Sequence, residues 1–255
     1  MSVTVGFLGD FGDALEFIVK EQDSVSKGLK VGGPAELASL LGTHMLVSIV
    51  SLAIAIAVSI PLGLFLGHKG KGEFIAISVS NVGRAVPAVI LLFFLVAFVG
   101  NGFRNVALVL VLLAIPPILT NAYVGARQVD KDVVDAARGM GMSGMQIVRQ
   151  VRLPLAMPTI FAGIRISAVS VIATATIGPF ANLRTLGEPI INDQIYGFSG
   201  QLGTAMVIAF VTLLVDAGIG LAQRAVTPRG LKLAEDASGS RLRLSLPTRR
   251  REAAT

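Results

Sequence analysis

Residues 130–158 read DKDVVDAARGMGMSGMQIVRQVRLPLAMP, the longest polar interruption in the central part of an otherwise apolar chain. Apolar runs that are too long for a helix in a soluble core flank this stretch on both sides. Helix-forming residues with an apolar stripe over 133–138 predict a first helix, and Asp130 or Asp132 is placed to cap its start.

After this helix, three glycines predict a helix break and a sharp turn. They are Gly139, Gly141 and Gly144. Residues 145–151 are again amphipathic and predict a second helix, which should stop at Leu153 and Pro154 because proline cannot continue a helix. The stretch is therefore predicted to be a helix–turn–helix loop between two membrane spans.

The spacing in this loop resembles that of a cytoplasmic loop in the permease subunits of ABC importers. The shared pattern is EAA, three residues, Gly, nine residues, a hydrophobic residue, any residue and Leu-Pro, with Asp in place of the leading Glu here. The matching positions are Asp135, Ala136, Ala137, Gly141, Leu153 and Pro154. The resemblance implies that they form the contact with a separate ATPase, whereas the alternative is a surface helical hairpin with chance matches.

From about residue 44 to 230 the chain resembles the permease subunits of osmoprotectant importers, those for glycine betaine, carnitine and choline. The resemblance lies in SIPLGLFLG, NVGRAVPAVILL, IPPILTNAYVGARQVDKDVVDAARGMGM and VRLPLAMPTIFAGIRISAV. It implies an importer with two permease subunits, identical or paralogous, two ABC ATPases and an extracytoplasmic substrate-binding protein. One stretch departs from the family: where a GAGGLG-like run is usual, the chain reads IGPFANLRTLGEPI, and residues 180–185 do not match.

The composition is that of a membrane protein. Apolar residues make up 53% of the chain and charged residues 15%, whereas soluble domains carry about a quarter charged residues. The net charge of +6 is explained by positive-inside topology, because most basic residues lie in short loops and the tail, so no nucleic-acid partner is expected. With no cysteine, thiolate metal sites and disulfides are excluded.

We predict an all-α polytopic protein of the bacterial inner membrane, with an outer N-terminus and a cytoplasmic C-terminus. The five predicted spans are residues 45–67, 74–99, 106–126, 159–177 and 202–222. Lys69 and Lys71 then lie inside, and the outer loops carry few basic residues. Pro116 and Pro117 fall within the third span, so we expect that helix to pack inside the bundle.

Three regions are predicted along the chain. Residues 1–41 form an extracytoplasmic segment, with an interfacial helix over 11–19 or else a poorly ordered terminus. Residues 42–228 form the permease domain, in which 127–158 is the coupling loop. Residues 229–255 form a basic cytoplasmic tail, predicted to be disordered, and a tether to anionic membrane lipid is the alternative.

No motif of a catalytic site is found in the sequence. It contains no phosphate-binding GxxxxGK[ST] loop, no HExxH and no GxSxG. His44 and His68 lie at the two ends of the first span, and we interpret both as interfacial residues. We expect a permease that is not an enzyme and holds no cofactor, with ATP and Mg on the partner ATPase. The alternatives are an importer for another small solute, such as an amino acid, a secondary transporter, or a membrane-embedded enzyme.

Polar residues inside the spans are the remaining candidates. Five small or polar residues are expected to line the pathway or, alternatively, to pack helices closely: Asn81, Ser167, Ser170, Thr174 and Thr176. The ionisable residues in the apolar runs are Arg84, Arg165 and Asp216. Helix rise places them at a similar depth in the inner leaflet. We therefore predict that Asp216 pairs with Arg165 or else with Arg84, and separate snorkelling of each arginine is the alternative.

Overall fold

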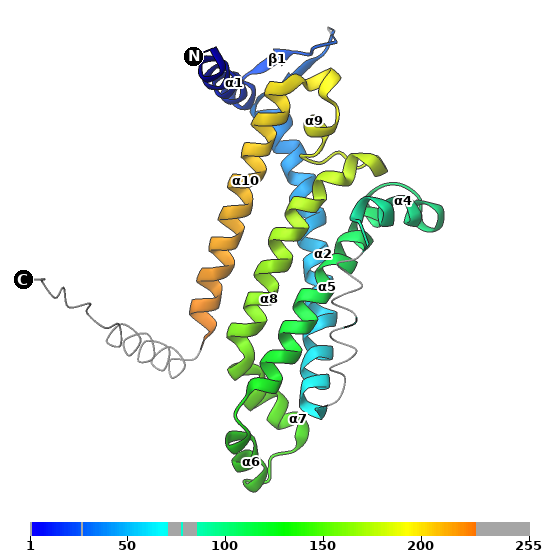
Figure 1. Ribbon diagram of the computed structural model, residues 1–255. Coiled ribbons are helices and arrows are strands. Elements are labelled where there is room, and N and C mark those ends of the chain that lie inside the picture. The colour runs from blue at the N-terminus through cyan, green and yellow to red at the C-terminus, as the bar shows by residue number, and fades with distance from the viewer. Residues whose placement is uncertain (1, 27, 71–77, 79–85, 228–255) are drawn as a thin grey trace, which may run out of the picture.

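The computed structural model describes residues 2–26, 28–70, 78 and 86–227. Within them, four helical runs are long and apolar enough to cross a membrane: Gly33–Lys69, Phe103–Gln128, Gly144–Ala181 and Asp193–Val226. Figure 1 shows the long helices lying side by side in an elongated bundle. The predicted all-α polytopic architecture is confirmed.

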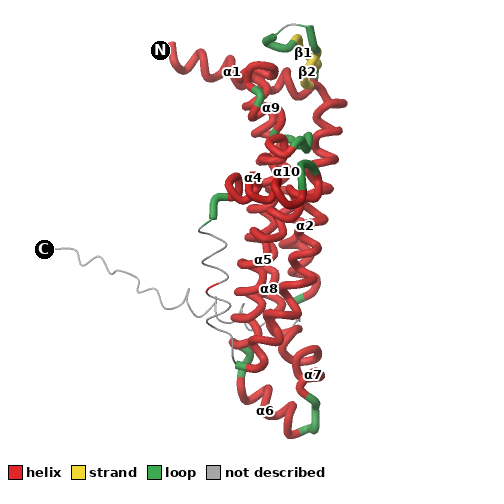
Figure 2. Tube along the Cα trace, turned by 90° about the vertical axis from the view of Figure 1, so that its right-hand side faces the viewer, coloured by secondary structure: helices red, strands yellow, loops and turns green. Residues whose placement is uncertain are grey.

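In chain order the elements are α1 (Ser2–Val19), β1 (Glu21–Asp23), β2 (Lys30–Gly32), α2 (Gly33–Lys69), α4 (Ala88–Val99), α5 (Phe103–Gln128), α6 (Lys131–Gly139), α7 (Gly144–Gln146), the π-helix η1 (Ile147–Arg152), α8 (Leu153–Thr174), the 3₁₀-helix η2 (Ala175–Ala181), α9 (Glu188–Ile191) and α10 (Asp193–Val226). Figure 2 shows that helices make up nearly all of the described chain, with the two short strands at one end.

Helix α5 lies in the middle of the bundle, between α2 and α8. Its Pro116 is buried, as expected for proline at membrane depth. Serines on the neighbouring helices donate to α5 carbonyl groups just before this proline: Ser59 donates to Ile115 at 3.3 Å and Ser167 donates to Ala114 at 2.9 Å. The predicted burial of this helix is thus confirmed, and both neighbours are hydrogen-bonded to its backbone.

Helices α2 and α5 approach each other along a seam of small residues. A Cβ atom on Gly63 would lie 2.6 Å from the Ala122 Cβ, and one on Gly67 would lie 2.7 Å from the Ala126 Cβ. Pairs of small residues four positions apart allow two membrane helices to pack backbone against backbone. This seam fixes the register between the first long helix and the central one.

The end of the bundle that carries α1, called the outer end after its predicted position, has structure that the sequence analysis did not predict. Strands β1 and β2 form an antiparallel hairpin in which Glu21 pairs with Gly32. A helix was expected over 11–19 and is found, but it is longer, and its Phe17 is 0% exposed and packs edge-on against Tyr196 of α10. Figure 1 shows α1 and the hairpin together over the top of α10.

The predicted span over 74–99 is described only in part. Its residues 88–99 form α4, which stands out from the side of the bundle next to α5. Asn81 and Arg84 lie outside the described residues, as does the predicted tail 229–255. The first span also differs from its prediction: α2 begins at Gly33, twelve residues before the expected start at 45. At about 1.5 Å per residue its 37 residues exceed the membrane core, so this helix also builds the outer end.

Candidate functional site

The loop between α5 and α8 is a folded unit. Asp130 caps α6, because its side chain accepts a hydrogen bond from the Asp132 backbone N–H at 2.9 Å. Val134 and Ala137 are each 2% exposed and pack with Ile147 in a small core beneath the loop. The predicted capped helix is confirmed, and its apolar stripe is used to hold the two halves of the loop together.

The turn after α6 depends on one glycine. Gly141 has φ +82°, and its N–H donates to the Arg138 carbonyl at 2.9 Å while the Met142 N–H donates to the Ala137 carbonyl at 3.2 Å. These two bonds make a Schellman motif, which requires a left-handed residue at the position of Gly141. A Cβ there would meet nothing within 4 Å, so the requirement is for the backbone angle. Gly139 belongs to α6 and does not break it.

The second half of the loop runs without a break into the membrane. Ser143 and Gln146 form a capping box at its start. The chain then passes through the π-helical segment Ile147–Arg152 and directly into α8, which begins at Leu153. The predicted stop at Leu153 and Pro154 is wrong. Pro154 lies in the first turn of α8. A proline is tolerated there because the wider π-helical turn that precedes it needs no hydrogen bond from the N–H that Pro154 lacks.

The loop positions that match the permease motif divide into two groups. Three are exposed: Asp135, Ala136 and Gly141. Leu153 and Pro154 are half-buried, and Leu153 packs against a cluster containing Leu64 and Ile160. Ala137 is buried in the core of the loop, so its side chain packs within the loop and does not face outward. An alanine three residues after the buried Val134 faces the same side of the helix.

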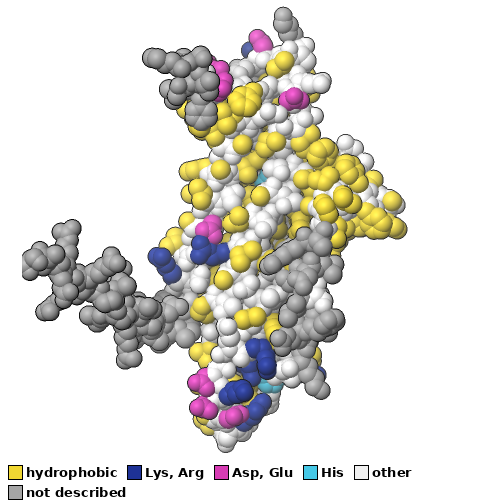
Figure 3. Space-filling view, viewed as in Figure 1, with side chains coloured by type: hydrophobic (Ala, Val, Ile, Leu, Met, Phe, Trp, Pro, Cys, Tyr) yellow, Lys and Arg dark blue, Asp and Glu magenta, His cyan; other side chains and the backbone are white. Residues whose placement is uncertain are grey.

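The tip of the loop presents both apolar and charged groups. Met140 is 76% exposed beside Gly141, and Asp135 is bonded to Arg138 at 3.0 Å on the surface of α6. Figure 3 shows acidic and basic side chains gathered at this end of the molecule. The sequence analysis did not single out Met140, and no local pattern in the sequence marks it as exposed.

Arg165 and Asp216 form the ion pair that was predicted between spans. The Arg165 Nε lies 2.8 Å from Oδ1 of Asp216, and its Nη2 lies 2.6 Å from Oδ2. The pair joins α8 to α10 and lies partly open at the side of the isolated chain. The alternative of separately snorkelling side chains is wrong for Arg165, whereas Arg84 lies outside the described residues.

The pathway candidates on α8 and η2 do not share one environment. Ser167 is buried and donates to the Ala114 carbonyl, which is the packing role named as its alternative. Ser170 is exposed and lies on the same face of α8 as the exposed Ile166 and Ala173. Thr174 and Thr176 are half-buried, and Thr176 donates to the Ala173 carbonyl at 2.7 Å. Among the described candidates, Ser170 is the one with an open side chain.

His44 corrects an interpretation drawn from sequence. It was expected at the interface, yet it is 0% exposed and its Nε2 bonds to the Ile172 carbonyl at 2.9 Å. The reason is that α2 extends outward well beyond the expected end of the span, so His44 lies inside the bundle. His68, at the other end of α2, is half-buried.

A polar cluster at the outer end was missed. Glu36 accepts from the Tyr196 hydroxyl at 2.8 Å, from Arg184 at 3.0 Å and from the Gly32 N–H at 2.8 Å, while Arg184 also lies 4.0 Å from Glu188. The cluster links the start of α2 to the segment after η2. Glu36 is the one acidic residue between positions 24 and 72. A single carboxylate in an apolar stretch was the feature of the sequence that could have indicated a buried polar cluster.

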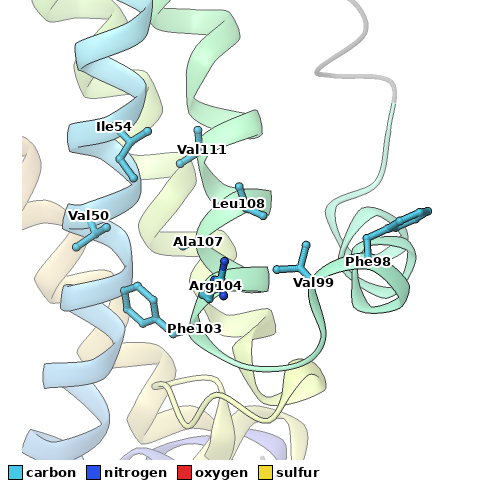
Figure 4. Close-up of a pocket in the computed structure, with 9 residues that line it drawn as sticks. All are labelled: Val50, Ile54, Phe98, Val99, Phe103, Arg104, Ala107, Leu108 and Val111. Carbon is cyan, nitrogen blue, oxygen red and sulfur yellow. The ribbon is translucent and has the colours of Figure 1, made fainter.

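A cavity of about 520 Å³ lies between α2, α4 and α5. Arg104 is the one charged residue of its lining, and Figure 4 shows Phe98 pointing away from the other lining residues. Its lining is otherwise apolar: Val50, Ile54, Phe98, Val99, Phe103, Ala107, Leu108 and Val111. A polar solute site requires converging polar groups, so this cavity is unsuited to hold one.

The comparison with known families agrees with this geometry. The model for the binding-protein-dependent transport system inner membrane component matches residues 59–231, a range that includes the whole folded loop and both members of the ion pair. The chain belongs to this family. It is therefore a multi-pass inner-membrane permease subunit, of a family that works with ATPase and binding-protein partners and has no ATPase site of its own.

Several curated relatives of this permease align over most of their own length. The carnitine transport permease protein OpuCB of Listeria monocytogenes is 34% identical over 194 residues, covering 76% of this chain and 89% of that protein. The glycine betaine/carnitine/choline transport system permease protein OpuCB of Bacillus subtilis is 32% identical, with 77% and 91% covered. The osmoprotectant import permease protein OsmY of Salmonella typhimurium is 30% identical, with 72% and 80% covered.

Among solved structures, the permease resembles a chain of the MetNI methionine ABC transporter in an inward-facing crystal form. The TM-score is 0.66 at 22% identity, and the match covers 76% of this chain and 97% of that chain. At this identity the likeness concerns the fold. The long helices and the loop between α5 and α8 are arranged as in the fold of that chain.

Proposed function

We propose that this permease carries a small osmoprotectant across the membrane: glycine betaine, choline, carnitine or a proline-like compatible solute. The observation that carries the proposal is the set of relatives at 30–34% identity that are named for carnitine, choline, glycine betaine or osmoprotectant transport. The chain has no Trp and 2 Tyr, so it lacks the aromatic side chain best suited to cage a quaternary ammonium ion. Tight recognition of the solute then falls to an external binding protein.

Coupling to ATP is assigned to α6 and the turn after it. Asp135, Ala136 and Met140 are exposed there, and a short amphipathic helix of this kind suits a groove on a soluble ATPase. Gly141 sets the angle at which this helix is presented. Because residues 144–181 form one helical run, a displacement of the loop is transmitted along α8 to the middle of the membrane.

The partners follow from this assignment. A separate ABC ATPase holds ATP and Mg²⁺, and a second permease subunit, identical or paralogous, completes the pathway. We place the N-terminus outside and the C-terminus in the cytoplasm, with the loop and Lys69 inside. The exposed face of α8 that carries Ser170 is the surface we assign to the pathway between the two permeases, since Ser170 and Ala173 offer a hydroxyl and a small side chain beside the apolar Ile166 and Val169.

Uptake in cells tests the proposal. A strain lacking this chain is complemented with the wild-type gene, and uptake of labelled glycine betaine, choline, carnitine and an amino acid is compared. We expect at least one osmoprotectant to require the chain, and its uptake to be unaffected by excess amino acid. Uptake of an amino acid alone would contradict the proposed substrate class and would favour the alternative of an amino-acid importer.

A further inference from the structure

A second polar site lies on the membrane side of α6. It is a cavity of about 270 Å³ between the C-terminal ends of α2 and α5, helix α6 and the end of η1. Its lining residues are His68, Lys69, Gly70, Arg127, Lys131, Val134, Asp135, Arg138 and Arg152. Five of these are lysine or arginine, and Asp135 is the one carboxylate. The cavity is therefore strongly cationic.

The charges of this cavity are not balanced by the described part of the chain. Asp135 is occupied by Arg138 at 3.0 Å. Arg127 and Lys131 have no ion-pair partner among the residues that the structure describes. Arg152 donates through Nη1 to the Ala126 carbonyl, but its buried Nε has no partner there.

Capping of helix ends does not account for this surplus. The C-termini of α2 and α5 reach the cavity, and each supplies a partial charge of about −0.5 at most. That is far less than the charge of the arginines and lysines around it. Arginine in particular presents several N–H groups in a fixed fork that matches phosphate oxygens. The geometry thus suits a phosphate group.

The cavity lies at the level expected for lipid headgroups. It opens where two membrane helices end. The Lys69 Nζ lies 4.3 Å from the centre of the Phe65 ring, and Phe65 is itself exposed on the surface of the bundle. Lysines that cover apolar residues in this way reach toward the interface. Basic pockets between membrane helices on the cytoplasmic side bind anionic headgroups.

The position of the cavity favours a membrane lipid over an acidic group of the ATPase as the occupant. Lys131, Asp135 and Arg138 are spaced to lie on one face of α6 and line the cavity together with residues of α2 and α5. The edge of α6 that carries them borders the membrane helices, and the side chains of Asp135 and Arg138 are also largely exposed. The exposed Ala136 and Met140 lie elsewhere on the loop.

We propose that this cavity binds the phosphate of an anionic phospholipid headgroup in the cytoplasmic leaflet. Arg127, Lys131 and Arg152 contact the phosphate, and the lipid bridges the ends of α2 and α5 to the loop. The inference needs only the cytoplasmic position of this end of the bundle, and it holds whichever solute the permease carries.

Native mass spectrometry of the full chain tests this proposal. The chain is extracted from nanodiscs with equal phosphatidylglycerol and phosphatidylcholine, and the lipid that remains bound is counted. We expect retained phosphatidylglycerol, lowered about fivefold for each cation removed in Arg127→Gln and Lys131→Gln. Arg149→Gln is the matched control, because Arg149 lies in the same segment as Arg152 but lines a different, largely apolar cavity. Arg127→Lys keeps the charge but not the fork of N–H groups, and should retain more lipid than Arg127→Gln.

Three outcomes would overturn the proposal. Equal retention by the wild type and the Arg127→Gln, Lys131→Gln double variant would show that the cavity does not hold the lipid. An equal loss in Arg149→Gln would assign the effect to the general surface charge. Displacement of the lipid by millimolar inorganic phosphate would assign the site to the free ion. Circular dichroism of each variant checks that the helices are intact, and transport is not needed for any of these readings.

Discussion

Arg165 of α8 and Asp216 of α10 are joined by two parallel hydrogen bonds, at 2.8 and 2.6 Å. Helix α10 packs mainly against α8 and α1, and little of its membrane segment is buried within the chain. In the hydrocarbon layer an unpaired charge is costly. The pair therefore fixes how α10 sits against the helix that continues into the coupling loop.

Breaking one half of this pair should harm the protein more than removing both halves. Asp216→Asn leaves the Arg165 guanidinium without its counter-ion, whereas Asp216→Asn with Arg165→Gln leaves two neutral groups that hydrogen-bond to each other. We expect the single variant to unfold at a lower temperature in nanodiscs than the double variant. Equal melting temperatures would show that the two charges do not depend on each other.

Gly141→Ala should uncouple transport, and Gly139→Ala should not. Both positions have open space for a Cβ, but only Gly141 has a positive φ, where an L-residue costs about 1–2 kcal/mol. Labelled-solute uptake, normalised to the amount of chain in the membrane, measures the effect. We expect a severalfold loss for Gly141→Ala and partial recovery in Gly141→Asn, since asparagine tolerates this backbone region. Equal uptake by both alanine variants would remove the turn from the mechanism.

The local structure of this loop was predictable because short-range chemistry determines it. The Asp130 cap, the helix that follows and the turn at Gly141 each depend on a few neighbouring residues. Pairing of Asp216 with Arg165 was also predictable, because helix rise placed both charges at one depth and few ionisable partners exist in the spans. The burial of Ala137 was not predictable from the sequence, because it depends on how the second half of the loop folds back onto α6.

Long-range packing decided the features that sequence did not reveal. Pro154 predicts a helix end, but the π-helical segment before it continues directly into α8 without a break. His44 looked interfacial because the outer extension of α2 contains polar residues, and the helix continues since Leu37 and Leu40 pack into a core with α1 and α10. The Glu36 cluster joins residues 160 positions apart in the chain, a contact that no local pattern shows.

Cysteine placed at Ala136 should cross-link to the ATPase, and cysteine at Ala137 should not. The two positions are adjacent, but Ala136 is exposed and Ala137 lies in the core of the loop. The chain has no cysteine of its own, so each single-cysteine variant gives an unambiguous signal. A bifunctional thiol reagent and an ATPase with one surface cysteine provide the assay. Equal cross-linking at both positions would contradict the assigned contact face.

Ser170→Cys should react with a water-soluble thiol reagent during turnover, whereas Ser167→Cys should be protected. Ser167 is buried against the Ala114 carbonyl, and Ser170 lies on the open face of α8. The rate of modification with and without transported solute, read by mass spectrometry, distinguishes the two. Protection of Ser170→Cys under all conditions would place this face against lipid or a partner helix and remove it from the pathway.

The central claim is that an ATPase drives import through this chain. The most direct measurement is accumulation of labelled glycine betaine, choline or carnitine in proteoliposomes that contain the permease and its ATPase, with the binding protein outside and ATP inside. We predict accumulation against a gradient that requires all three proteins and ATP. Accumulation driven by an ion gradient without ATP or the ATPase would contradict the account and identify a secondary transporter.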